Sequence, residues 1–246
     1  MHRLMVDSAA LAMSAPTLPK EALNHLKVLR PKNDEPIELF DGRGQTRVFR
    51  YNEPSRTLTD PGELQTFAKP QPSLTLFACV TKGSRWDWTI EKATELGVTR
   101  IVPVISEHTI VRMTAGEREA KRARWARIAA DAARQSDAVW LPEILAPVTF
   151  AESLPLVRKT NCFVGALANP PARPLAAAVQ AALATPANEA PRELAVYVGP
   201  EGDFTSAELD TLLQLAIPTS FGPTVLRAET AAIFALSVVA ALASRA

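Results

Sequence analysis

Short apolar runs that lack polar alternation recur through the last two thirds of the chain, and each is followed by a helical pattern. These candidate strands are Leu74–Val80, Arg100–Ile105, Asn161–Ala168 and Leu194–Val198, and the more polar segment Pro218–Phe221 is a further short strand candidate. A strand that is apolar on both sides is buried on both faces, as in a parallel sheet. The predicted fold class is therefore α/β, with a mainly parallel sheet covered by helices on both faces.

Helical patterns fill the intervals between these strands. The expected helices are Ser84–Leu96, Gly116–Gln135, Thr149–Arg158, Leu175–Ala184, Ser206–Leu215 and Glu229–Ser244. Ser84 is the expected N-cap of the first helix, with Asp87 three residues later, and Gly97 is expected to end it. Thr185–Pro191 has the composition of a loop.

The first seventy residues follow a different pattern, rich in strand signals. Pro36–Phe40 and Thr46–Tyr51 are expected strands, and the turn Asp41–Gly44 between them predicts a hairpin. Pro19–Leu29 is expected to form a short amphipathic helix. The proline-rich segment Lys69–Ser73 is expected to link this part to the α/β part.

The chain has 246 residues, of which 47% are hydrophobic, enough for one large or two small domains. Its net charge of +1 argues against nucleic-acid binding by bulk electrostatics alone. Charge is uneven, however, because the segment Arg112–Arg134 holds seven basic and three acidic side chains. This helix is either a solvated face or a surface that contacts phosphates, and Trp125 within it is expected to pack in the core.

The two cysteines, Cys79 and Cys162, lie in apolar runs, with no second Cys or His at metal-ligand spacing. They are expected to be buried, reduced thiols of a cytoplasmic protein, and no metal site is expected. The N-terminal residues lack the pattern of a signal peptide, and no apolar run is long enough to span a membrane as a helix.

Two Gly-Pro loops follow expected strands, where an α/β sheet binds its ligands. The first is Gly199-Pro200-Glu201-Gly202, and the second runs from Gly222 through Arg227 to Thr230. The residues alone leave alternatives open: the first loop could be an ordinary turn, and Arg227 and Glu229 could serve a local ion pair and the helix dipole. Since the chain has neither GxGxxG nor a P-loop, a nucleotide-dependent transferase of another type is not favoured.

Together the GPEG loop and the VLRAETA loop resemble those of the SPOUT methyltransferases, and in particular the family that methylates uridine N3 in 16S rRNA. Further segments carry the same resemblance along nearly the whole chain. They are His25–Arg30 (HLKVLR), Asp41–Gly44 (DGRG), Lys82–Gly97, Ser106–Thr109 and Ala132–Ser136.

The resemblance implies a PUA-like β-barrel over residues 1–70 and a SPOUT domain with a deep C-terminal trefoil knot over residues 74–246. It also implies a homodimer that methylates 16S rRNA, within an assembled 30S subunit, and uses S-adenosylmethionine as cofactor. The loops that would hold the cofactor contribute Leu167, Ala168, Asn169, Gly199, Pro200, Glu201, Gly202, Gly222, Val225, Leu226, Arg227, Ala228, Glu229 and Thr230.

Roles in catalysis and RNA binding follow from the resemblance and from the chemistry of the reaction. N3 of uridine must lose a proton, so the expected catalytic residues are Arg227 for charge stabilisation and Glu229 or Glu201 as proton acceptor or loop support. The expected RNA-binding residues are His25, Lys27, Arg30, Arg43, Lys82, Arg85 and Arg134.

The chain departs from the family pattern at two positions. Asp203 follows Gly202 where the family usually has a second glycine, and Thr224 stands where a basic residue is usual. Two alternatives of the same fold remain: a methyltransferase of tRNA or 23S rRNA, and a non-catalytic RNA-binding protein. The HLKVLR and DGRG segments favour the 16S enzyme over the first, and the intact loops argue against the second.

Overall fold

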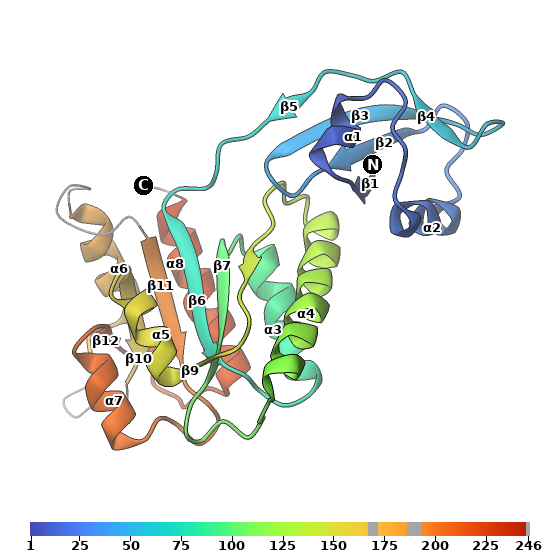
Figure 1. Cartoon of the computed structure of the whole chain (residues 1–246). Coiled ribbons are helices and arrows are strands. Elements are labelled where there is room, and N and C mark those ends of the chain that lie inside the picture. Colours follow the sequence, from blue (N-terminus) through green and yellow to red (C-terminus); the bar gives the residue numbers. More distant parts are fainter. Residues whose placement is uncertain (167–171, 186–192, 245–246) are drawn as a thin grey trace. The chain divides into compact units, whose positions relative to one another are not determined.

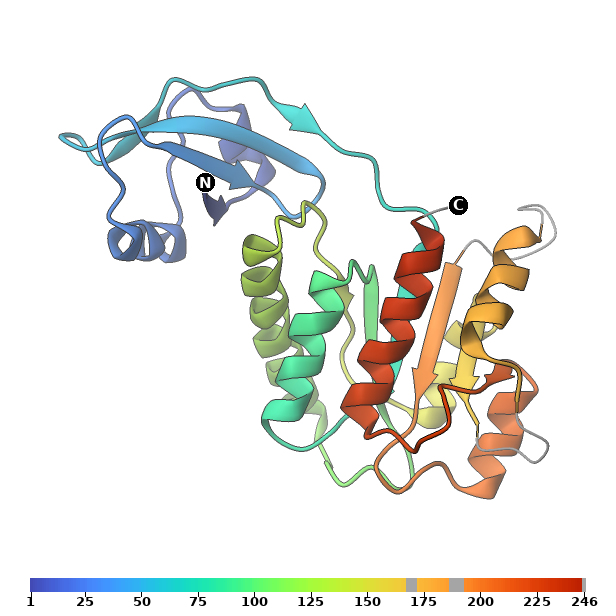
Figure 2. The same cartoon turned by 180° about the vertical axis from the view of Figure 1, so that it is seen from behind.

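The computed structural model describes residues 1–166, 172–185 and 193–244. The chain divides into two compact units (Figures 1 and 2). The first comprises residues 1–69 together with 130–141, and the second comprises residues 70–129 together with 142–246. Each unit has its own buried core, so each is described by itself.

A small sheet forms the frame of the first unit. Its strands are β1 (His2–Met5), β2 (Pro36–Phe40), β3 (Gln45–Asn52), β4 (Thr57–Thr59) and β5 (Gln65–Thr66). They lie in the order β1-β2-β3-β4, and β5 also pairs with β3. The predicted hairpin is confirmed, since β2 and β3 are antiparallel neighbours. β1 pairs in parallel with β2, a non-local pairing that local sequence patterns did not predict.

Helices α1 (Ser8–Ala12) and α2 (Lys20–Leu29) complete the first unit. The predicted helix at residues 19–29 is confirmed with Pro19 as its N-cap, whereas α1 was not predicted. Inward-facing residues of the strands, such as Leu4, Ile37 and Phe49, form a core with apolar residues of both helices.

The segment 130–141 belongs to the first unit because buried hydrogen bonds tie it there. Arg3 Nη1 on β1 donates to the carbonyl oxygens of Ala133 and Ala138, at 3.0 and 3.3 Å. Leu141 N donates to Gly42 O at 2.9 Å, and a Cβ at Gly42 would lie 2.5 Å from the Leu141 side chain. The glycine of the DGRG turn is therefore required for close packing as well as for its φ of +68°.

A parallel sheet forms the second unit. Its strands are β6 (Ser73–Cys79), β7 (Arg100–Ile105), β8 (Glu143–Ile144), β9 (Val148–Thr149), β10 (Asn161–Gly165), β11 (Glu193–Val198) and β12 (Ile217–Thr219). They lie in the order β12-β10-β11-β6-β7-β8, with β9 beside β7, and every pairing in the described part of the unit is parallel. The α/β prediction is confirmed. β10 ends at Gly165, and the predicted strand positions 167 and 168 lie outside the described residues; β12 ends at Thr219 rather than at 221.

Helices cover both faces of this sheet. They are α3 (Ser84–Glu95), α4 (Ala115–Gln135), α5 (Phe150–Val157), α6 (Leu175–Ala184), α7 (Ser206–Leu213) and α8 (Ala228–Ala243). Along β6, Leu74, Leu76 and Ala78 face a core shared with α3, α6 and α8, whereas Phe77 and Cys79 face a core shared with α5 and α7. This alternation explains why the strand sequences are apolar without a break.

The predicted N-cap of α3 is wrong, and other helix ends in the second unit lie within two residues of the prediction, as where α7 ends at Leu213 rather than Leu215. The N-cap of α3 is Gly83, with φ +71° and no side-chain hydrogen bond, and Ser84 is already helical. The predicted cap fails because Asp87 pairs with Arg124 of α4 instead of turning back to the helix end. Gly97 follows the end of α3 with φ +77°, as predicted.

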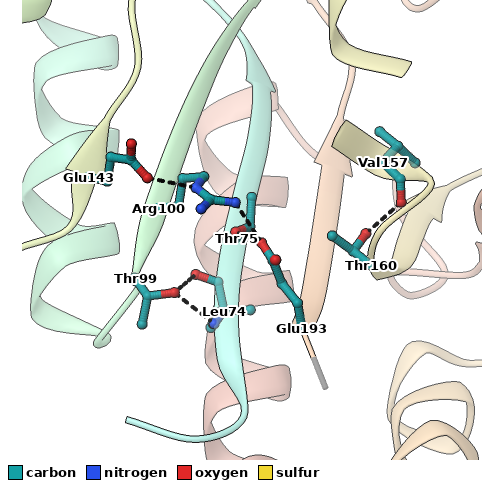
Figure 3. A network of polar contacts seen from close by, with 8 residues as sticks. All are labelled: Leu74, Thr75, Thr99, Arg100, Glu143, Val157, Thr160 and Glu193. Atoms are coloured by element: carbon teal, nitrogen blue, oxygen red, sulfur yellow. Dashed lines mark hydrogen bonds and ion pairs between the residues drawn. The ribbon is translucent and has the colours of Figure 1, made fainter. Parts of the chain in front are cut away.

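The amino-terminal edge of the sheet is joined by a polar network (Figure 3). Arg100 donates to Glu143 at 2.9 Å and to Glu193 at 3.2 Å, and the buried Thr75 also donates to Glu193. These contacts join the first residues of β7, β8 and β11 to Thr75, the third residue of β6. The opposite, carboxyl-terminal edge is left for the Gly-Pro loops.

Cys79 and Cys162 are free and buried, as predicted. Trp125 is also buried as predicted, edge-on to Trp86 with ring centroids 5.6 Å apart.

Much of the basic charge of α4 is locally paired, because Arg118, Arg122 and Arg124 contact carboxylates. Among the residues that the structure describes, no helix combines the length and apolar character needed to cross a membrane.

Candidate functional site

A cavity of about 370 Å³ lies at the carboxyl-terminal edge of β10, β11 and β12. These strands are parallel neighbours, so their ends and the loops that follow them meet at one edge. The loop after β11 supplies Gly199, Pro200, Glu201 and Asp203, and β10 ends at the cavity with Gly165 and Ala166. The loop after β12 and the start of α8 complete the lining with Ser220, Phe221, Gly222, Thr224, Val225, Leu226, Arg227, Ala228 and Ala231.

Two glycines let aromatic rings pack directly on the strand ends beside this cavity. A Cβ at Gly165 would lie 2.9 Å from the ring of Phe221, and a Cβ at Gly199 would lie 3.0 Å from the ring of Phe204. The first distance is shorter than real Cβ contacts, and the second is tighter than most of them, so that the Phe204 ring would have to shift slightly. The close packing places the backbone of the loops at the cavity wall, where its N–H and C=O groups can contact a ligand.

Asp203 occupies the left-handed region with φ +59°, a conformation that glycine adopts without strain. Its side chain stabilises the turn locally, since Oδ1 accepts a hydrogen bond from Phe204 N at 2.7 Å. His108 Nδ1 donates to the carbonyl oxygens of Gly202 and Asp203, at 3.1 and 2.9 Å. Aspartate tolerates this region better than most residues, which explains how the loop keeps its shape without the usual glycine.

The two glutamates of the predicted site come together on Arg85, a residue of the first turn of α3. Arg85 Nη1 lies 3.6 Å from Glu201 Oε1, and Arg85 Nε lies 3.8 Å from Glu229 Oε1. Glu229 is mostly buried, and its Oε2 has no hydrogen-bond partner in the described structure. A buried carboxylate oxygen without a donor is a strong acceptor that a ligand can satisfy.

Arg227 is the N-cap residue of α8 and is exposed. Its backbone carbonyl accepts the hydrogen bond from Ala231 N at 2.8 Å, while its side chain forms no ion pair with any described residue. The local ion pair considered for Arg227 is therefore absent, and Arg85 takes that role. The guanidinium of Arg227 stays available beside the cavity that its residue lines.

The predicted cofactor residues fall into three groups. Those that line the cavity are Gly199, Pro200, Glu201, Gly222, Val225, Leu226, Arg227 and Ala228. Gly202, Glu229 and Thr230 lie next to lining residues in the chain but are not part of the lining. Leu167, Ala168 and Asn169 lie outside the described residues.

The predicted RNA-binding residues occur in both units. His25, Lys27 and Arg30 lie on α2 or at its end, Arg43 lies in the DGRG turn, and Arg134 pairs with Asp131 at 3.3 Å. Burial and the neighbouring charge of Arg134 lower the pKa of His25. Lys82 and Arg85, in the second unit, flank the start of α3.

Sequence reasoning missed two features of the site. The aromatic rings of Phe204 and Phe221 shape the cavity walls, and Arg85 joins the two glutamates instead of standing apart from them. The available signal was that Arg85 stands at the start of the helix that follows the buried strand β6, a parallel neighbour of β11. Among the described residues, no group of three or more His, Cys, Asp or Glu side chains could hold a metal ion.

Comparisons with known proteins agree with this arrangement. Residues 68–240 match the RNA methyltransferase domain family. Ribosomal RNA small subunit methyltransferase E from Synechocystis sp. is 30% identical over 98% of this chain and 78% of that protein. The structure of ribosomal RNA small subunit methyltransferase E from Neisseria gonorrhoeae bound to S-adenosylmethionine is 27% identical, with a TM-score of 0.79 over 98% of both chains. A methyltransferase from Legionella pneumophila in complex with the same cofactor is 26% identical, with a TM-score of 0.82 over 98% of this chain and 97% of that one.

Proposed function

The chain belongs to the ribosomal RNA small subunit methyltransferase E family and is an S-adenosylmethionine-dependent rRNA methyltransferase, and we propose that its target is N3 of a uridine in 16S rRNA. The choice of Glu229 and Arg227 as the reacting groups rests on one observation. Among the described residues, the oxygen of Glu229 without a hydrogen bond and the guanidinium of Arg227 without an ion pair belong to the first turn and the N-cap of one helix. Arg227 lines the cavity, and Glu229 follows the lining residue Ala228 in the chain. N3 methylation needs both a proton acceptor and stabilisation of negative charge.

The cavity fits S-adenosylmethionine in its composition. Val198, Leu226 and Ala231 give it apolar walls for an adenine ring, and the loops at 199–203 and 220–227 offer backbone groups for the polar edges of the cofactor. The loop residues proposed to hold it are those predicted from the sequence, including Leu167, Ala168 and Asn169. When bound, the cofactor supplies a methyl group on a sulfonium, which is an electrophile.

Glu229 is the residue we assign as acceptor of the N3 proton. Its Oε1 is held by Arg85, so the carboxylate is oriented with Oε2 left to accept. Glu201, which contacts Arg85 at 3.6 Å and is more exposed, is assigned the role of positioning Arg85 and the first loop.

Arg227 is assigned the stabilisation of charge. As the uracil loses its N3 proton, negative charge spreads onto O2 and O4, and a fixed cation near these atoms lowers the barrier. The exposed guanidinium of Arg227 is free of carboxylate partners in the described structure, so its charge is not neutralised beforehand. The base must leave its stack and any pairing to expose N3.

We extend the proposal to the domains and the assembly. The first unit is proposed to be a PUA-like barrel that holds RNA through His25, Lys27, Arg30 and Arg43, with Lys82, Arg85 and Arg134 as further RNA contacts. The C-terminal part of the second unit is proposed to form a trefoil knot, supported by the return of the chain from β12 past the ends of β10 and β11 into α8. A homodimer is supported by the exposed Val225 and Phe234.

The test is methyl transfer from labelled S-adenosylmethionine to purified 30S subunits that lack native rRNA methylation. After digestion, 3-methyluridine is identified by mass spectrometry, with Arg227→Ala assayed in parallel. Formation of 3-methyluridine in 16S rRNA, and a loss of about a hundredfold or more in the variant, support the proposal. Methylation of tRNA or 23S rRNA instead, or cofactor binding without methylation of any of these RNAs, would overturn it.

A further inference from the structure

A second cavity, of about 720 Å³, lies at the amino-terminal end of α3. It is bounded by residues 80–84 after β6, by residues 110–112 and by α4, all within the second unit. None of these residues lines the cavity at the ends of β10, β11 and β12. We call it the α3 cavity.

The α3 helix begins at this cavity without a side-chain cap. Its N-cap is Gly83, which offers no acceptor to the amides of the first helical turn. A Cβ built at Gly83 has open space around it, and φ there is +71°. An uncapped helix start with free N–H groups and the positive end of the dipole favours an anion.

Two buried side chains give an independent indication that a ligand binds here. Thr81 and Trp86 line the α3 cavity and are only 4% and 2% exposed. Thr81 Oγ1 and Trp86 Nε1 have no hydrogen-bond partner in the described structure. Both atoms can donate, so acceptor oxygens of a ligand would satisfy them.

The charges around the α3 cavity also match an anion. Lys82 and Lys121 line it, and neither has a carboxylate oxygen within 4.0 Å among the described residues. Arg112 also lines it and donates to the carbonyl oxygens of Ser106 and Glu107, so its charge is not cancelled. The acidic lining residue, Asp87, pairs with Arg124 through Oδ2, while its Oδ1 is buried without a hydrogen-bond partner in the described structure.

We propose that the α3 cavity binds a backbone phosphate of the substrate RNA. Four features support an oxyanion: the open helix start, the two unpartnered donors, the unpaired lysines and Arg112. The RNA assignment rests on the proposed function and on chain connectivity. Residues 81–84 of the cavity run directly into Arg85, which contacts Glu201 and Glu229. A phosphate held here fixes the register of the RNA near the reacting groups without reading a base.

Anion binding is tested first, without RNA. Sodium phosphate is titrated into the full chain while tryptophan fluorescence is recorded, with sodium chloride of equal ionic strength as reference, because Trp86 and Trp125 line the cavity. We expect a saturable response that weakens about tenfold in the Lys82→Ala/Lys121→Ala variant. Thr81→Val should weaken it as well without lowering thermal stability, since the hydroxyl has no partner to lose. Lys159→Ala, an exposed lysine on the loop before β10, should not change it.

RNA binding is tested second, by methyl transfer to 30S subunits. We expect the double lysine variant to raise KM for 30S about fivefold or more, with kcat within about twofold. Saturable phosphate binding with an unchanged KM would mean a free anion site and overturn the RNA assignment. No saturable response in the wild type would overturn the site itself. If the wild type does not methylate 30S, the proposed function fails, and equal binding of 16S rRNA by wild type and double variant would then reject this inference separately.

Discussion

Arg85 Nε lies 3.8 Å from Glu229 Oε1, across the packed pair of helices α3 and α8. Figure 2 shows the two helices side by side. The same guanidinium lies 3.6 Å from Glu201, in the loop after β11. One arginine thus joins two acids that are remote in sequence, one in the loop after β11 and one in the first turn of α8. Arg85 approaches only one oxygen of Glu229, and the other oxygen has no hydrogen-bond partner among the described residues.

Replacing Arg85 by alanine should lower kcat for methyl transfer about five- to tenfold. The side chain of Arg85 is about half exposed, and such an ion pair contributes about 1 kcal/mol, which corresponds to roughly that factor. Cofactor affinity, measured by calorimetry, should change little because Arg85 does not line the cavity. Arg127→Ala, an exposed arginine of α4, is the matched control. If Arg85→Ala loses no more activity than Arg127→Ala, the contacts of Arg85 with the two glutamates have no role in the reaction.

Replacing Glu229 by glutamine should lower kcat by about a hundredfold or more, because a positioned proton acceptor contributes about that much. The amide keeps the size of the side chain but cannot accept the N3 proton. Single-turnover kinetics across a range of pH separates this role from a structural one. If Glu229 is the base, its replacement should flatten the acidic limb of the pH profile. A variant that keeps the wild-type profile and loses only thermal stability would reduce Glu229 to a positioning residue.

The sequence predicts well what depends on local pattern. The buried strands and most helices of the second unit follow from unbroken apolar runs and 3.6-residue periodicity, and Gly97 ends α3 as its backbone requires. Pairings between distant segments were not predictable in this way. β1 pairs with β2 across two helices, and Arg3 bonds to Ala133, because long-range packing decides those contacts.

In the candidate site, too, local motifs were predictable from the sequence and contacts between distant segments were not. The two Gly-Pro loops are visible as motifs, and parallel topology explains why they meet at one edge. The contacts of Arg85 with Glu201 and Glu229 depend on which residue of α3 faces α8. That in turn depends on how the two helices cross. The N-cap at Gly83 was missed because Asp87 has a stronger partner in Arg124, a tertiary contact that overrides the local capping signal.

Position 203 should tolerate replacement of Asp203 by glycine but not by alanine. With φ at +59°, a residue with a Cβ is strained, and the aspartate offsets part of that strain through its bond to Phe204 N. Asp203→Gly relieves the strain, so its free energy of unfolding should stay within about 0.5 kcal/mol of wild type. Asp203→Ala keeps the strain and loses the bond, and should cost about 1 kcal/mol. Urea unfolding measures both variants, and an alanine variant as stable as the glycine variant would contradict the backbone argument.

Changes to the polar network at the amino-terminal edge of the sheet should lower the free energy of unfolding without changing methyl transfer. Glu193→Ala removes the acceptor of the fully buried Thr75 hydroxyl and one partner of Arg100 (Figure 3), at a cost of about 1–2 kcal/mol. Adding Thr75→Val should restore part of the loss, since the unsatisfied hydroxyl is then gone. Methyl transfer below the melting temperature should match wild type for both variants. Loss of activity in a folded Glu193→Ala variant would show that this edge is coupled to the site.

The two buried thiols, Cys79 and Cys162, should lower the free energy of unfolding at alkaline pH. Burial raises the pKa of Cys79 to about 12, although the hydroxyls of Ser106 and Thr109 oppose the shift, and burial also raises the pKa of Cys162. Unfolded thiols ionise near pH 8.5, so above that pH the unfolded chain loses protons that the folded chain keeps. The free energy of unfolding is therefore unaffected by the thiols below about pH 8 and falls as pH rises further, by up to about 1.4 kcal/mol per pH unit for each thiol.

Urea unfolding at pH 8 and pH 10 measures this alkaline loss, and the Cys79→Ala/Cys162→Ala variant is the comparison. The variant should be less stable at pH 8, because two buried side chains are shortened, but should lose less stability between the two pH values. Tyr197, whose pKa burial also raises, is present in both proteins and so does not affect the difference. In the native wild type, both thiols should react with a thiol reagent only as fast as the protein opens. Equal alkaline losses in the two proteins, or immediate labelling of either cysteine at pH 8, would show that the thiols are not held protonated by burial.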